Sequence, residues 1–156
     1  MATIYVTSGA ATGPTEMASY DAALAEANLH NYNLVTVSSV VPADATVDRV
    51  DAAPDLGPAG GRLTVVQSRV TTDEAGRVCA GLGWATGPGP GLFYEASGTD
   101  ADGVADEIRR GLDAGAALRD WTLDDREVVV EAAEADPDVF TTAVVLAAYG
   151  ESEPIV

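Results

Sequence analysis

Short runs of β-branched and other apolar residues, separated by turns rich in glycine and proline, constrain the fold of this 156-residue chain more than any other feature. Such runs have the length and the alternation of β-strands. Only two stretches, about 16–29 and about 100–119, repeat apolar residues at helical spacing. The pattern predicts an α+β domain with two helices and several largely antiparallel strands. At this length we expect one domain.

The expected strands account for most of the remaining apolar residues. We expect them at 2–7, 34–41, 62–70, 76–84, 92–96, 126–132 and 140–148. The run at 34–41 is typical of one buried strand, although Ser38 and Ser39 interrupt it. We expect a loop at 8–15. The segment 43–61, which contains prolines and several Asp and Gly residues, is predicted to be a loop that covers the core.

Each expected helix has a cap and an apolar face. Thr15 can cap the first helix, and Asp100 or Asp102 lies near the start of the second. The apolar faces follow helical spacing and consist of Met17, Tyr20 and Leu24 in the first helix and of Val104, Ile108, Leu112 and Leu118 in the second. Asp21 falls on or beside the first of these faces.

Acidic residues outnumber basic ones by 25 to 8, so the net charge is −17. Nucleic acid and anionic membrane surfaces gain nothing from such a partner, and we expect neither to bind. All eight basic residues are arginine. Without lysine, the chain has no Walker-type phosphate site and cannot form a lysine Schiff base with pyridoxal phosphate. This acidic, lysine-free composition is typical of proteins that work in high salt, so we expect a halophilic cytoplasm as the setting.

Metal and hydrolase chemistry find little support, because the chain has one cysteine, Cys79, and one histidine, His30. Disulfide frameworks and zinc sites need more ligands, so we expect no metal. A triad through His30 would lack the G-x-S-x-G elbow. The glycines at 81–91 precede no expected helix, which favours a turn over a phosphate site. We also expect no signal peptide, and no run approaches the ~20 apolar residues of a membrane span.

Polar residues in apolar surroundings are the candidates for chemistry. Asp21 needs a partner that offsets its desolvation: an arginine, backbone N–H groups, solvent or a cationic ligand. Glu95 interrupts the strand at 92–96. It faces either solvent or the interior, where its pKa would rise and suit it to proton donation. Ser38 and Ser39, taken alone, are hydroxyls that would hydrogen-bond to the backbone.

The sequence around these serines, NLVTVSSVVP from Asn33 onward, resembles the self-cleavage site of the pyruvoyl-dependent arginine decarboxylases. The resemblance covers about residues 3–149, and its blocks keep the family's relative spacing. The further blocks are GPTEMASYDAALAEANLHNYNL upstream, then GLFYEASG and RDWTLDD downstream. The chain departs from the family in VVPADA, where a second proline is common, and in MASYD, where an Asn is common.

The resemblance implies an αββα sandwich and a homo-oligomer, a trimer of cleaved protomers with active sites between subunits. In this family Ser39 becomes a covalent pyruvoyl group, which is the cofactor, and Ser38 ends the upstream chain. Asn33 assists cleavage. Glu95 is the proton donor, and Asp21 contacts the guanidinium group of the substrate.

The implied function is conversion of L-arginine to agmatine and CO2, a step of polyamine biosynthesis, by a single domain 1–156 cleaved into chains 1–38 and 39–156. A protein-derived ketone fits a decarboxylase that lacks lysine, because the reaction needs an electron sink. One alternative is a pyruvoyl decarboxylase for another amino acid, such as histidine or, less well matched to Asp21, aspartate. Another is an uncleaved paralogue that acts as a binding or structural oligomer.

Overall fold

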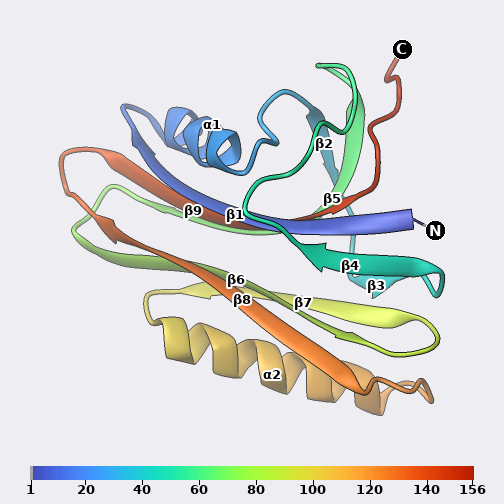
Figure 1. The fold of residues 1–156 in the computed structure, drawn as a ribbon. Helices are drawn as coiled ribbons and strands as arrows, with labels where there is room; N and C mark the ends of the chain where they lie inside the picture. Colours follow the sequence, from blue (N-terminus) through green and yellow to red (C-terminus); the bar gives the residue numbers. More distant parts are fainter. Residues whose placement is uncertain (1) are drawn as a thin grey trace.

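Four layers form in the order helix, sheet, sheet, helix across residues 2–156, which the computed structural model describes (Figure 1). Helix α1 (Glu16–Glu26) covers one sheet, and helix α2 (Ala101–Ala117) covers the other. Thr15 and Asp100 cap these helices as predicted, since each side chain accepts a hydrogen bond from the backbone N–H three residues later. The α+β class and the αββα sandwich are confirmed.

Nine strands form the two sheets within residues 2–156. The five-stranded sheet has the order β2 (Asn33–Thr36), β5 (Arg62–Thr72), β9 (Phe140–Tyr149), β1 (Ala2–Gly13) and β4 (Ala45–Arg49). The four-stranded sheet has the order β3 (Val40–Val41), β7 (Gly91–Gly98), β6 (Gly76–Thr86) and β8 (Asp125–Ala135). Neighbouring strands are antiparallel except in the pairs β1 with β4 and β2 with β5. The expectation of largely antiparallel strands is therefore confirmed.

Three apolar clusters hold the four layers together. The cluster between the sheets includes Phe93, the largest fully buried side chain. Ala23 and Leu24 of α1 belong to the second cluster, against the five-stranded sheet. Ile108 and Leu112 of α2 belong to the third, against the four-stranded sheet. Each sheet is therefore buried on both faces, which leaves the strand edges and their connections as the places for polar side chains.

The apolar faces predicted for the helices are partly wrong. Met17 is 64% exposed, because α1 turns Ser19 and Ala23 toward the sheet instead. Leu118 is 82% exposed, because it lies beyond the last turn of α2 as the C-cap residue. Helix α1 also ends earlier than predicted, and Asn28 just beyond it has a φ of 59°, a left-handed conformation that stops a helix.

Two predicted loops contain strand residues. Strand β1 continues to Gly13, because its second half pairs with β9 along its whole length, so the loop expected at 8–15 is wrong in most of its range. The segment 43–61 contains β4, which pairs with β1, although its buried Ala53 and Leu56 do cover the core as expected. Neither helix among residues 2–156 is long and apolar enough to cross a membrane.

The expected single strand at 34–41 is also wrong. It is divided into β2 in one sheet and β3 in the other, and most of its side chains are exposed rather than buried. The division follows from the pairing partners: β2 runs parallel to β5, whereas β3 runs antiparallel to β7. The chain must therefore pass from one sheet to the other between these two strands.

Gly9 lets α1 lie directly on β1, because a Cβ atom at this position would overlap the Ala23 carbonyl oxygen and approach Glu26. We therefore expect Gly9→Ala to lower the free energy of unfolding by about 1–3 kcal/mol, the usual range for overpacking. Thermal unfolding in high salt measures the change. Gly89→Ala is the matched control, since a Cβ atom there meets nothing within 4 Å. Equal midpoints for the two variants would contradict the packing argument.

Candidate active site

The chain crosses between the two sheets after β2 and before β3, and Ser38 and Ser39 lie on this crossing. On the first side, the backbone N–H of Val37 donates to the carbonyl of Val65 on β5 at 2.9 Å. On the second side, the backbone N–H of Phe93 on β7 donates to the carbonyl of Ser39 at 2.8 Å. Ser38 is exposed and Ser39 is half-buried. The peptide bond between the two serines therefore lies in a segment that is anchored to a different sheet at each end.

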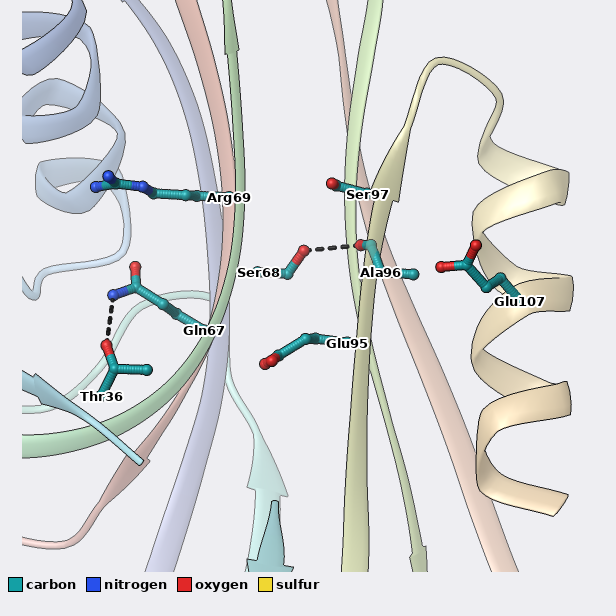
Figure 2. A pocket seen from close by; sticks show the side chains of 8 residues that line it. All are labelled: Thr36, Gln67, Ser68, Arg69, Glu95, Ala96, Ser97 and Glu107. Atoms are coloured by element: carbon teal, nitrogen blue, oxygen red, sulfur yellow. Dashed lines mark hydrogen bonds between the residues drawn. The ribbon is translucent and has the colours of Figure 1, made fainter. Parts of the chain in front are cut away.

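Glu95 on β7 faces the space between the sheets. It lies two residues after Phe93, and side chains two apart on a strand point to the same face. Phe93 belongs to the inter-sheet cluster, and Figure 2 shows the Glu95 carboxyl directed away from α2 and into the gap between β7 and β5. The intervening residue, Tyr94, faces α2 instead, where its ring leaves no room for a side chain at Gly111. Of the two orientations left open for Glu95, the structure shows the inward one.

The surrounding strands raise the pKa of Glu95 above its ordinary value of 4.5 by desolvating the carboxyl group. The side chain still reaches solvent. Among residues 2–156, no hydrogen bond or ion pair is formed by its carboxyl oxygens. Glu95 therefore keeps its proton to a higher pH than a fully hydrated glutamate, a property that suits general acid chemistry.

A pocket of about 640 Å³ opens beside Glu95 between the two sheets. Its lining residues come from β2, β5, β7 and α2 and are Thr36, Gln67, Ser68, Arg69, Glu95, Ala96, Ser97 and Glu107 (Figure 2). The hydroxyl of Ser68 donates to the carbonyl of Ala96 at 2.7 Å and so joins the two sheets across this space. The pocket is lined by both a cationic side chain, Arg69, and carboxyl groups, those of Glu95 and Glu107. Such a lining suits a small zwitterionic molecule better than an apolar one.

Asp21 and Asn33 line a second pocket, of about 610 Å³, between α1 and β2. Asp21 is exposed, and no ion pair among residues 2–156 includes it. The side-chain amide of Asn33 donates to the carbonyl of Gly60 at 2.8 Å. His30 is exposed in the turn after α1 and lines the same pocket. The carboxylate of Asp21 is therefore free to bind a cation from outside the chain.

The two pockets share one wall, Gln67 on β5. Its side chain accepts a hydrogen bond from the hydroxyl of Tyr20 on α1 at 2.8 Å and donates to the hydroxyl of Thr36 on β2 at 3.1 Å. Within the chain the predicted site residues are thus divided between two pockets. Glu95 lies in the first pocket, whereas Asp21 and Asn33 lie in the second.

Two polar residues near the crossing segment were not predicted as site residues. Gln67 interrupts an apolar strand much as the serines do, so the same signal was available for it. Tyr149, at the end of β9, donates its hydroxyl to the carbonyl of Val40 at 2.8 Å. No local pattern indicates this contact, because it joins residues 109 positions apart that belong to different sheets.

The raised pKa of Glu95 has a consequence for stability. Because the pKa of Glu95 is higher in the folded than in the unfolded protein, its proton binds more tightly in the folded state. The stability that protonated Glu95 contributes is therefore present below about pH 4.5 and is lost as the pH rises through the folded-state pKa. We therefore expect Glu95→Gln to raise the melting temperature at pH 7 and to leave it unchanged at pH 4. Glu127→Gln, which removes an exposed charge on β8, is the control. An equal rise in melting temperature for both variants at pH 7 would contradict a raised pKa of Glu95.

Comparisons with known proteins identify the family of the chain. The family model for pyruvoyl-dependent arginine decarboxylase matches residues 3–154. The chain is 54% identical to a protein of Halobacterium salinarum with that name over 157 aligned residues, which cover 99% of this chain and 98% of the relative. A relative from Pyrococcus furiosus with the same name is 32% identical over 148 residues and covers 90% of this chain and 91% of its own. The chain belongs to the pyruvoyl-dependent arginine decarboxylase family.

Proposed function

We propose that this chain is a self-processing decarboxylase that converts L-arginine to agmatine and CO2. The observation that carries the proposal is the position of the Ser38–Ser39 peptide bond, on an anchored crossing between two sheets and next to the strand that bears Glu95. The relatives from Halobacterium salinarum and Pyrococcus furiosus are both named arginine decarboxylases that depend on a pyruvoyl group. Agmatine formation would place the enzyme in polyamine biosynthesis.

Processing would begin when the Ser39 hydroxyl oxygen attacks the carbonyl carbon of Ser38. The peptide C–N bond breaks, the Ser39 nitrogen becomes an amine, and an ester joins the two residues. Loss of the Ser39 α-proton and cleavage of its Cβ–Oγ bond then release the Ser38 carboxylate and leave a dehydroalanine at position 39. Tautomerisation and hydrolysis expel ammonia and produce the pyruvoyl group at the start of the chain 39–156.

The residues around Ser39 fit such a group. The carbonyl of Ser39 survives processing as the amide carbonyl of the pyruvoyl group, and the N–H of Phe93 already holds it. Ser39 is half-buried, which limits access of water. When formed, the pyruvoyl ketone supplies the electron sink that a decarboxylation requires, and a chain without lysine cannot anchor pyridoxal phosphate in the usual way.

Glu95 is proposed to donate the proton that replaces the departing CO2 at the substrate α-carbon. Its carboxyl group faces the inter-sheet space and has a raised pKa, and both properties suit a general acid. Asp21 is proposed to bind the substrate guanidinium group, since a carboxylate accepts two hydrogen bonds from its planar fork. Asn33 is proposed to assist cleavage, as its place in the family motif implies.

A trimer with active sites between subunits would explain why one protomer divides these residues. Asp21 and Glu95 lie in different pockets of one chain, and in such a trimer a second copy would bring the Asp21 of one chain to the Glu95 of another. The valines that flank the serines support a covered surface here, because Val35, Val37 and Val40 are 40%, 38% and 44% exposed.

Self-processing predicts two chains, 1–38 and 39–156, in place of one. At a mean of about 102 Da per residue (15.9 kDa over 156 residues), intact mass should show species of about 4 and 12 kDa, the larger one blocked to Edman degradation. Ser39→Ala should remain a single chain, because it removes the attacking hydroxyl. Ser97→Ala removes a hydroxyl from the neighbouring pocket and should be cleaved normally. An uncleaved, inactive wild-type protein would instead indicate the binding or structural oligomer.

Substitutions at the two carboxylates should separate recognition from chemistry. We expect Asp21→Asn to raise KM for arginine strongly and to weaken the preference for arginine over uncharged amino acids. Glu95→Gln should instead lower kcat by about 10²-fold or more. Both variants should still be cleaved. Steady-state assays of released CO2 with a panel of amino acids measure the contrast, and an unchanged KM in Asp21→Asn would assign that carboxylate a structural role only.

A further inference from the structure

Tyr149 forms the single side-chain hydrogen bond to residues 37–41 within the described part of the chain, through its hydroxyl to the carbonyl of Val40 at 2.8 Å. The tyrosine comes from the end of β9 in the five-stranded sheet, whereas Val40 begins β3 at the edge of the four-stranded sheet. This bond therefore joins the two sheets at the crossing segment. Burial raises the pKa of Tyr149 to about 12, so its hydroxyl stays protonated and able to donate at neutral pH.

Aromatic rings connect the Tyr149 hydroxyl to the second contact of the crossing segment, the hydrogen bond from Phe93 to Ser39. The ring centroids of Tyr149 and Phe93 are 6.1 Å apart, and those of Phe93 and Trp84 are 6.3 Å apart. The backbone N–H of Phe93 holds the carbonyl of Ser39. Two consecutive carbonyls, those of residues 39 and 40, are thus held from the same aromatic cluster, one by a backbone group and one by a side chain.

Cleavage at Ser38–Ser39 would change how far residue 39 depends on these two hydrogen bonds for its position. Before cleavage, the crossing segment is also held from its other side, by the bond from Val37 to Val65. After cleavage, that bond belongs to the smaller chain and no longer restrains residue 39. Strand β3 pairs with β7 over only two residue pairs, so the new end would depend on the contacts of Phe93 and Tyr149.

We infer that Tyr149 is a positioning residue, which holds Val40 so that the group formed at residue 39 keeps one orientation toward Glu95. This inference rests on the proposed self-processing. Fixing the carbonyls of residues 39 and 40 limits rotation of the backbone between them. The alternative is that the Tyr149 ring only fills the core, in which case removal of the hydroxyl changes nothing at β3.

The test is Tyr149→Phe, which keeps the ring and removes the donor. We expect normal cleavage, an unchanged KM and a kcat lowered about fivefold or more, the factor expected for loss of one hydrogen bond. Hydrogen exchange of the cleaved, substrate-free protein, measured by mass spectrometry, should rise in the peptide that begins at residue 39 and stay unchanged in β6 and β9. Tyr5→Phe, a tyrosine on β1 whose hydroxyl forms no hydrogen bond among residues 2–156, is the control.

Wild-type kcat together with wild-type exchange at β3 in Tyr149→Phe would overturn the inference and leave the proposed function intact. A general rise in exchange across both sheets would also overturn it, because that result indicates loss of fold stability rather than of local positioning. Failure of the wild-type protein to be cleaved would instead refute the proposed function itself. The three outcomes are distinguishable in one set of samples.

Discussion

The apolar cluster between the two sheets is the interaction on which the rest of the structure depends. It joins two sheets that each carry a helix on the outer face, so the sheets can pack on each other only through this layer. Because β2 and β3 belong to different sheets, the chain must cross the edge of the cluster between them. The crossing places Ser38 and Ser39 at the border between buried apolar residues and solvent.

The same cluster sets the chemistry of Glu95. Phe93 anchors β7 with its side chain in the inter-sheet space, and the alternation of the strand then directs Glu95 into that space. A carboxyl group there loses part of its hydration, which raises its pKa. The packing that stabilises the fold therefore also raises the pKa of Glu95, with no additional charged partner.

The distribution of ion pairs leaves the carboxylate of Asp21 without an arginine partner among residues 2–156. Four arginines form ion pairs at the surface, and such exposed pairs contribute about 0–1 kcal/mol each; they are Arg62–Glu153, Arg77–Glu134, Arg109–Asp106 and Arg126–Asp113. Arg69 lies over the ring of Tyr20 at 4.4 Å, and Asp21, the next residue along α1, has no such pair among residues 2–156. The acidic side chains near α1 are thus left to solvent or to a ligand.

Much of the fold was predictable, because helix caps, turns and apolar periodicity are local properties. Thr15 and Asp100 cap the helices as their side chains suggest, and Ile108 and Leu112 are buried at the expected spacing. The candidate carboxylates and serines could be named because their neighbours in the chain form recognisable blocks. Met17 was predicted wrongly, because α1 is rotated so that Ser19 and Ala23 pack against the sheet beside Leu24, which leaves Met17 exposed.

The sequence by itself therefore determined the two helices, most of the strands, the absence of lysine chemistry and the choice of Ser38 and Ser39 as candidate residues, since all of these depend on neighbouring residues or on composition. The tertiary structure decided how 34–41 is divided between sheets, which way Glu95 points and that Tyr149 reaches Val40. These features depend on pairings between distant segments, such as β7 with β3 and β9 with β5. Periodicity cannot encode such pairings, because it reports which face of a strand is apolar and not which strand lies beside it.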